Sequence, residues 1–287
     1  MAKDKYSATW VSHSSLSDFI KCPRAYYLKN VYKRAQTGHK IQLTAPPMTL
    51  GSAVHEVLES LSILPANSRF NDPLLPKFES VWKKFSGKVG GFIDTETENK
   101  YKERGKEMLR RIEKNPEPLS RLAVKIDMDL PSFWLSPEDN ILLCGKIDWL
   151  EYLPETDSVK IIDFKTSKME EKADSLQLPI YHLLVHNCQK RKVDSAAYWY
   201  LETQDAPTPK ELPDLKESAE KILKIAKQIK LARALKKFDC PHNGCKSCES
   251  LEKIFQGEGE FVGVNSFGQD CFILPQKSEG TGDGTIL

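Results

Sequence analysis

Three stretches decide the predicted fold: Gly145-Lys146-Ile147-Asp148, then Ile161-Ile162-Asp163-Phe164-Lys165-Thr166, and then Gln177-Leu178-Pro179-Ile180-Tyr181. Asp148 and Asp163 each lie in or beside an apolar run rich in β-forming residues. A buried carboxylate is costly unless it pairs with a cation or binds a metal. The pattern therefore predicts that both acids have a charged partner inside the fold.

Two neighbouring strands are predicted around these acids. Residues 140–152 form the first strand, residues 158–166 form the second, and a Pro- and Asp-containing turn joins them into a hairpin. Because side chains alternate along a strand, Asp163 and Lys165 share one face, about 7 Å apart. We expect Asp148 to face them from the partner strand.

Two carboxylates beside an ammonium group form a site for a hard cation such as Mg²⁺ or Mn²⁺. Such a metal polarises a phosphodiester and lowers the pKa of a bound water. The lysine can orient that water or stabilise developing charge. Taken alone, however, an Asp-x-Lys pair is typical of an ordinary surface ion pair, and the rest of the sequence has to distinguish the two.

Two further motifs precede the acids. Residues Ser12–Leu28 follow the pattern S-x-S-x-L-x-x-F-x-x-C-P-x-x-Y-x-L, and Gly51-x-x-x-His55 follows them. With G-x-x-D, D-F-K-T and Q-x-x-x-Y in this order, the chain resembles the PD-(D/E)XK nuclease superfamily. More narrowly, it resembles the RecB-type exonuclease branch and is similar to the nuclease halves of bacterial recombination helicase–nucleases and to CRISPR-adaptation nucleases.

The resemblance implies an α/β fold in which helices flank a restriction-endonuclease-like mixed β-sheet. It predicts a single nuclease domain over residues 1–274. We expect a helical N-terminal part over 12–115, a catalytic core over 120–205, and a C-terminal helix with a cysteine cluster over 213–256. Residues 275–287 are rich in Gly, Ser and Thr and predict a disordered tail.

The resemblance also assigns roles to individual residues. It implies that Asp148 and Asp163 bind the metal and that Lys165 orients or activates the attacking water. His55 would be a metal ligand or a neighbour of the phosphate. The carbonyl of Phe164 would supply a further oxygen ligand.

Gln177 and Tyr181 lie on one face of a predicted helix, four residues apart. They would contact the substrate or hold Lys165 in place; the alternative is a structural helix-face pair with a buried tyrosine. An acid of the preceding strand, Asp127 or Asp129, is expected to complete the site.

Three of the seven cysteines lie within nine residues, at Cys240, Cys245 and Cys248, and they need a fourth ligand. Four cysteines suit zinc or an iron–sulfur cluster. In RecB-like relatives an N-terminal cysteine, here Cys22, often joins three C-terminal ones around a [4Fe–4S] cluster. This chain departs from their usual spacing, because its third cysteine precedes the C-x-x-C pair. Two alternatives remain. One is a zinc site, with His242 as a further candidate ligand, and the other is that the cysteines bind no metal.

Composition sets wider limits. Of 287 residues, 40% are hydrophobic and 29% charged, as in ordinary globular proteins. No apolar run could span a membrane, and the N-terminus lacks an apolar signal-peptide core, so we expect a cytoplasmic protein without a membrane partner. A net charge of +2 neither favours nor excludes nucleic acid. Lysines at helical spacing over 221–237 could follow phosphates or form a solvated face.

The remaining elements follow from periodicity and turn signals. We predict helices, strands and loops as follows: a helix from Ser14 or Ser15 to about Asn30, a loop over 38–47, helices over 49–64, 73–86 and 96–115, a strand over 122–130, a helix over 173–190, a strand over 194–201, a linker over 207–213, a helix over 214–237, and a hairpin of 261–264 with 271–274.

The predicted function is therefore a Mg²⁺- or Mn²⁺-dependent DNA exonuclease in DNA repair, recombination or foreign-DNA processing. Its expected partner is single-stranded or free-ended DNA. The sequence has no Walker-type phosphate-binding motif, so a motor would have to be a separate helicase or a repair or CRISPR partner. A non-catalytic DNA-binding or scaffold module with a structural metal site is the alternative, and hydrolysis of another phosphoester is a third interpretation.

Overall fold

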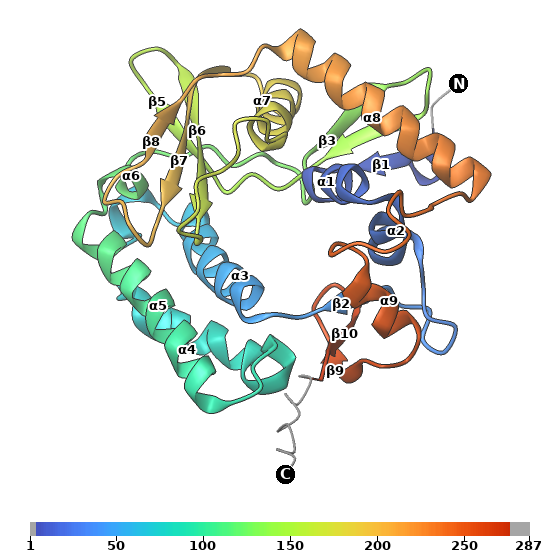
Figure 1. Cartoon of the computed structure of the whole chain (residues 1–287). Helices are drawn as coiled ribbons and strands as arrows, with labels where there is room; N and C mark the ends of the chain where they lie inside the picture. Colours follow the sequence, from blue (N-terminus) through green and yellow to red (C-terminus); the bar gives the residue numbers. More distant parts are fainter. Residues whose placement is uncertain (1–3, 276–287) are drawn as a thin grey trace, which may run out of the picture.

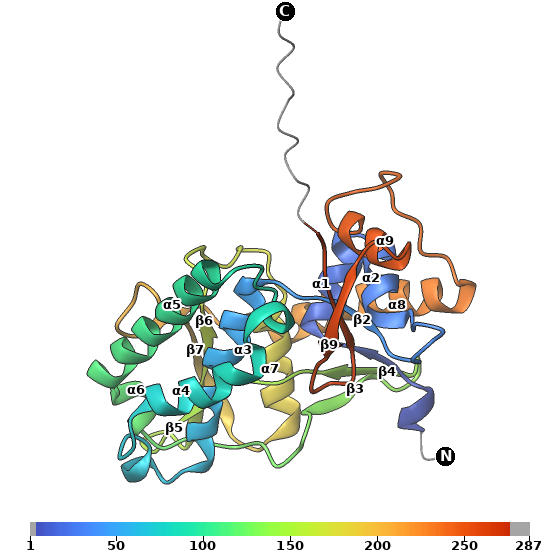
Figure 2. The same ribbon diagram turned by 90° about the horizontal axis from the view of Figure 1, so that it is seen from below.

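The computed structural model describes residues 4–275, which form three small β-sheets flanked by helices. Figure 1 shows one sheet together with the helices over 46–120 on one side of the molecule and the chain's last strands on the other, and Figure 2 shows the same separation from below. This mixed α/β architecture agrees with the predicted fold class. None of the described helices is long and apolar enough to cross a membrane.

The four-stranded sheet carries the second predicted strand at its centre. Its strands, in spatial order, are β5 (Trp149–Leu153), β6 (Ser158–Lys165), β7 (Lys192–Tyr200) and β8 (Thr208–Lys210). β5 pairs antiparallel with β6, as the predicted hairpin requires, whereas β6 and β7 are parallel. Helix α7 (Gln177–Cys188) makes the crossover between the two parallel strands. The predicted linker over 207–213 is wrong in part, because it contains the short edge strand β8.

The two faces of β6 belong to different hydrophobic clusters. Val159 and Ile161 pack with α7, whereas Ile162 and Phe164 pack with the helices of the other face. Those helices are α3 (Pro46–Glu59), α4 (Leu74–Trp82), α5 (Thr95–Lys114) and the short α6 (Glu117–Ser120). Asp163 therefore shares the α7 side of the strand with Ile161, as alternation predicts.

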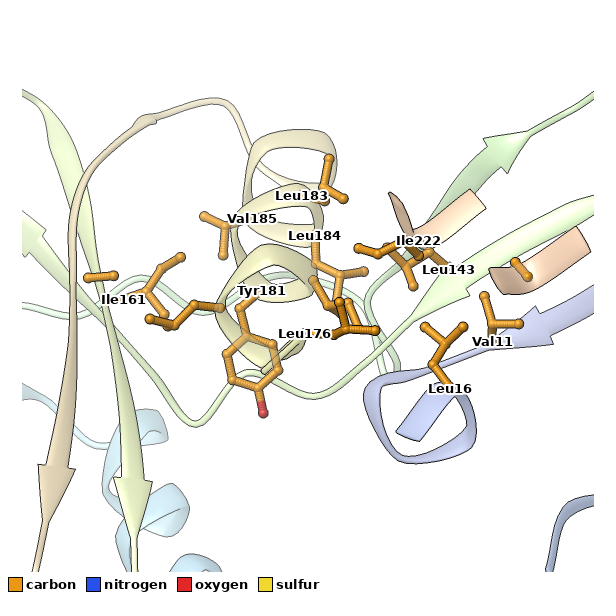
Figure 3. Close-up of a cluster of buried hydrophobic side chains, with 14 of the residues drawn as sticks. Val11, Leu16, Leu143, Ile161, Leu176, Tyr181, Leu183, Leu184, Val185 and Ile222 are labelled. Atoms are coloured by element: carbon orange, nitrogen blue, oxygen red, sulfur yellow. The ribbon is translucent and has the colours of Figure 1, made fainter. Parts of the chain in front are cut away.

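Figure 3 shows the cluster on the α7 side. Val185 of α7 faces Ile161 of the central strand on one flank. On the other flank, Leu184 points toward Leu143 of the second sheet, beyond which lies Val11. Helix α7 thus joins two sheets that share no strand, and burying its apolar residues between them stabilises their relative position.

The second sheet corrects the predicted first strand. Its strands are β1 (Thr9–Val11), β4 (Ile141–Cys144) and β3 (Ser132–Ser136), and α8 (Leu215–Leu235) packs against it. Residues 140–152 are thus not one strand, because the chain leaves β4 at Gly145 and enters β5 in the other sheet at Trp149. A β-carbon at Gly145 would lie 2.9 Å from Leu184 Cδ1, so glycine lets the chain cross close beneath α7.

The predicted strand over 122–130 is also wrong. Only Ala123 makes a β-bridge there, to Glu151, and most of the segment is exposed. An alternating sequence needs a partner strand as well as the right pattern, and β3 forms instead over the next residues.

The first predicted helix is broken at Cys22. Ser12, rather than Ser14 or Ser15, caps α1 (His13–Lys21) through a reciprocal hydrogen-bonded box with Ser15. Cys22 is extended, with φ −168°, before α2 (Pro23–Tyr26) and a π-helical turn over 27–31. Proline at 23 explains the break, because it disfavours the helical conformation of the residue before it.

The C-terminal strands form a third sheet, with the order β2 (Ile41–Leu43), β10 (Asp270–Ile273) and β9 (Glu260–Val264). The predicted hairpin of β9 and β10 is confirmed. The predicted loop over 38–47 is wrong in part, because it contains β2 and the start of α3. We call α2, α9 (Glu249–Phe255) and this sheet the cysteine lobe. Of the predicted tail, residues 276–287 lie outside the described part.

Asp270 fastens the N-terminal part of the chain to the cysteine lobe. Its fully buried carboxylate accepts hydrogen bonds from Arg34 Nη1 at 2.6 Å and Thr37 Oγ1 at 2.7 Å, and lies 2.8 Å from His39 Nδ1. Burial alone would raise the pKa of Asp270, but these three partners outweigh it and lower the pKa. The charged form is therefore the one that the fold stabilises.

We expect Asp270→Asn to lower the free energy of unfolding by about 2 kcal/mol at neutral pH, because it weakens charge-assisted hydrogen bonds. The folded-state pKa is lowered, so this contribution is complete above the ordinary aspartate pKa of about 3.9 and is lost as the pH falls through the folded value. Urea unfolding at several pH values measures the difference, which should narrow below about pH 4. Asp239→Asn, at a 76% exposed side chain, is the control; equal effects of the two would contradict the assignment.

Candidate active site and cysteine cluster

Helix α3 presents two potential ligands from its last turns. His55 and Glu59 are four residues apart and so lie on one face. The His55 ring packs edge-on against Phe164 of β6, with ring centres 6.0 Å apart. This contact directs the histidine toward the central strand.

Asp148 lies directly before β5, where the chain has just crossed between the two sheets. Its Oδ2 accepts a 2.9 Å hydrogen bond from the Phe164 main-chain amide, and its Oδ1 lies 3.4 Å from His55 Nδ1. The carboxylate is 8% exposed. Asp148 thus lies against the D-x-K strand β6, as the sequence predicts. It directly precedes β5, however, and does not lie within a strand.

Lys165 is surrounded by oxygen atoms. Its Nζ lies 2.9 Å from Asp163 Oδ2 and 3.1 Å from Glu171 Oε2, and it donates to Gln177 Oε1. The ring of Tyr198 lies on another side, 5.0 Å from Nζ. The ammonium group is thus held in one place by partners from the central strands, from the loop that follows β6 and from α7.

Gln177 connects most of these groups. Its Nε2 donates to Asp163 Oδ1 at 2.7 Å and to the Tyr181 hydroxyl at 3.2 Å, while its Oε1 accepts from Lys165. Gln177 and Tyr181 therefore lie beside the acids, as the helical spacing predicts. The structure also shows the contact to Lys165 that the sequence analysis offered as one of two roles.

The two buried carboxylates perturb each other. Burial, followed by the neighbouring Asp148 charge, raises the pKa of Asp163 to about 8, even though Lys165 and His55 act in the opposite direction. Burial would also raise the pKa of Asp148, but His55 and the Phe164 amide lower it. Like charges this close need a cation, and this pair has His55 and Lys165 as its nearest positive groups.

The basic groups respond to the same charges. Burial would lower the pKa of His55, but Asp148 and Asp163 raise it to about 8. Burial would likewise lower the pKa of Lys165, and Asp163 and Glu171 raise it. A bound divalent cation would replace the proton on His55, because a metal binds the neutral imidazole.

The site fits a divalent metal. One ligand atom each of His55, Glu59 and Asp148 lies within 4.8 Å of the others. Asp163 is not part of this group, and its buried Oδ2 lies 2.9 Å from Lys165 Nζ. Carboxylate oxygens with one imidazole suit Mg²⁺ or Mn²⁺.

Glu59 was missed by the sequence analysis, which expected Asp127 or Asp129 to complete the site. The group of potential ligands contains neither of these acids. The available signal was the His55-x-x-x-Glu59 spacing, which places both side chains on one helix face. Glu171 was also missed, because only the folded loop brings it to Lys165.

The four predicted cysteines meet in the cysteine lobe. The sulfur atoms of Cys22, Cys240, Cys245 and Cys248 all lie within 4.8 Å of one another, whereas His242 is not part of the group. The main-chain amides of Cys248 and Ser247 help to lower the pKa of Cys245 to about 6. Thiolates are the form that binds zinc or iron–sulfur clusters, so this set of donors fits either.

An ion pair joins the two segments that carry these cysteines. Cys22 lies in the break between α1 and α2, and α2 is tied to α9 by the ion pair of Arg24 with Glu252, at 2.5 Å. Cys248 caps the start of α9. The ion pair therefore brings the N-terminal and C-terminal cysteines to the same side of the lobe.

Comparison with known protein families gives a match over most of the chain. The family model of the PD-(D/E)XK nuclease superfamily matches residues 10–252. The chain belongs to this superfamily. The match spans the N-terminal motif, the acids, Lys165 and the cysteines, and membership implies nuclease activity with a divalent metal. A search of curated proteins found no match.

We expect wild-type protein to bind Mn²⁺ and Asp148→Asn to bind it at least tenfold more weakly, because a buried charged ligand is removed. Glu59→Gln should also weaken binding if this carboxylate faces the ion. Isothermal titration calorimetry with MnCl₂ measures both. Glu56→Gln is the control on the same helix, because Glu56 and Glu59 each pair with a lysine but only Glu59 belongs to the ligand group. Equal affinities of Glu59→Gln and Glu56→Gln would remove Glu59 from the site.

Proposed function

We propose that the chain is a Mg²⁺- or Mn²⁺-dependent DNA exonuclease of the RecB-like branch. The observation that carries the nuclease assignment is the convergence of His55, Asp148, Asp163 and Lys165 from three separate segments. The branch assignment rests on the motif order and on the meeting of Cys22 with three C-terminal cysteines, because the resemblance ties that arrangement to RecB-like relatives.

Each residue has a role that its contacts support. His55, Asp148 and Asp163 would hold the cation, with Glu59 and the Phe164 carbonyl as further oxygen ligands. When bound, the cation supplies charge that polarises a phosphodiester and acidifies water. Lys165 is held by Asp163, Glu171 and Gln177 with its ammonium group at the carboxylates, where it can orient water and stabilise negative charge on phosphate oxygens.

Gln177 and Tyr181 would act as positioning residues. The Gln177 amide contacts both Lys165 and Asp163, so it fixes the separation of the ammonium and the carboxylate. Tyr181 in turn fixes the amide. Holding reactive groups in one geometry is a large part of enzymatic rate enhancement.

The first test uses end-labelled linear DNA and closed circular DNA, each single- and double-stranded, with Mn²⁺ or with EDTA. We expect metal-dependent release of nucleotides from linear DNA, and Lys165→Ala should lower the rate about a hundredfold or more. Lys160→Ala, on the same strand, is the matched control and should retain activity.

The outcomes separate the interpretations. If wild-type protein equals Lys165→Ala on every substrate, the chain is the alternative, a non-catalytic DNA-binding or scaffold module. If circles are cut as fast as linear DNA, the enzyme is an endonuclease. The proposed setting is DNA repair, recombination or foreign-DNA processing, with any motor supplied by a separate helicase or by a repair or CRISPR partner.

We further propose that Cys22, Cys240, Cys245 and Cys248 hold a [4Fe–4S] cluster, with zinc as the alternative. The cluster would close a loop of most of the chain and fasten α2 to the segment before α9. Its role would be structural, because the cysteines belong to a hydrophobic cluster apart from the acids.

We expect protein purified without oxygen to be brown, to absorb near 400 nm, and to contain iron and sulfide in equal amounts. Cys22→Ser should abolish the absorption and lower the melting temperature. Cys271→Ser is the control, because Cys271 is buried but lies outside the four-cysteine group. Colourless protein with one zinc per chain would establish zinc instead, and protein without either metal would refute the cofactor.

A further inference from the structure

A cavity of about 130 Å³ opens beside the acids of the site. Glu59 of α3, Ser62 just beyond the end of α3 and Asp148 are among its lining residues. Residues of the irregular segment over 123–131 line it as well. The cavity thus shares Glu59 and Asp148 with the metal site, whereas Lys165 and Gln177 do not line it.

The cavity exists because two chain segments separate and rejoin. At one end the Val124 amide donates to the Leu150 carbonyl at 2.9 Å, and at the other the Gly145 amide donates to the Pro131 carbonyl at 3.1 Å. Between these two bonds no described backbone hydrogen bond joins the segments. Polar main-chain groups therefore border the gap and need an outside partner.

Its walls combine these polar groups with apolar side chains. Ile126, Met128 and Ile147 supply apolar surface, while Lys125 and Asp129 add opposite charges. A cavity of about 130 Å³ holds several water molecules and has room for one small ring. Mixed apolar walls with polar edges suit a heterocycle, and a thioether such as that of Met128 packs well against an aromatic ring.

We propose that this cavity receives one unpaired nucleobase of the DNA, next to the phosphate that lies at the acids. The inference rests on the proposed nuclease function and names the substrate class of that site: DNA ends with unpaired nucleotides. A base inside a duplex cannot enter, because it is stacked and paired, so the enzyme has to act on single strands or on frayed ends.

The test uses single-stranded, end-labelled DNA in which one nucleotide is either intact or abasic. Base stacking and hydrogen bonding are together worth about a fivefold to hundredfold effect per base. We expect single-turnover cleavage by the wild-type enzyme to slow about tenfold at one fixed distance from the abasic position, where the missing base leaves the cavity empty.

Ser62→Trp places an indole in the cavity wall. It should slow cleavage of intact DNA by a similar factor and remove the difference between intact and abasic substrates. Ile63→Trp is the matched control, because Ile63 is 65% exposed, adjacent in sequence and outside the cavity lining. The comparison of substrates with wild-type enzyme is decisive even if Ser62→Trp fails to fold.

The two proposals fail in different ways. Metal-dependent cleavage at equal rates on intact and abasic DNA would overturn the base-binding cavity and leave the nuclease function intact. An absence of cleavage on every DNA, with wild-type protein equal to Lys165→Ala, would overturn the nuclease function itself.

Discussion

The repulsion between the buried carboxylates of Asp148 and Asp163 is the constraint on which the site depends. Neither side chain is well hydrated, and burial together with the Asp148 charge raises the pKa of Asp163 to about 8. The surrounding structure offsets this cost with a main-chain amide from Phe164, the His55 ring and the Lys165 ammonium. These partners come from different elements, so the site forms only when α3, the start of β5 and β6 are packed together. A metal would add the positive charge that the protein only partly supplies.

Helix α7 satisfies a second requirement, that the site be rigid. Its apolar residues fill the space between two sheets, and its first turn carries Gln177 into hydrogen bonds with both Asp163 and Lys165. The packing that orders the two sheets therefore also orders the ammonium and the carboxylate. Helix α7, the crossover between the parallel strands β6 and β7, therefore both packs the core and positions the polar groups of the site.

Local pattern was enough to predict part of this arrangement. Alternation along residues 158–166 placed Asp163 and Lys165 on one face of the strand, and helical spacing placed Gln177 and Tyr181 on one face of the helix. The break at Cys22 was not predicted, although Pro23 carries a signal for it, since proline disfavours a helical residue before it. The division of residues 140–152 between two sheets could not be predicted from local pattern, because it depends on the close approach of Leu184 to Gly145, a contact between segments far apart in sequence. The place of Glu171 beside Lys165 could not be predicted for the same reason.

The cysteine lobe joins the two ends of the chain through contacts other than its thiols. The Arg24–Glu252 pair joins α2 to α9, and buried Asp270 joins β10 to the segment over 34–39. Both ties connect residues more than two hundred positions apart, so they meet the entropic cost of closing the chain independently of the sulfur ligands. A metal or cluster held by Cys22 and the three C-terminal cysteines would add a third tie between the same two ends of the chain.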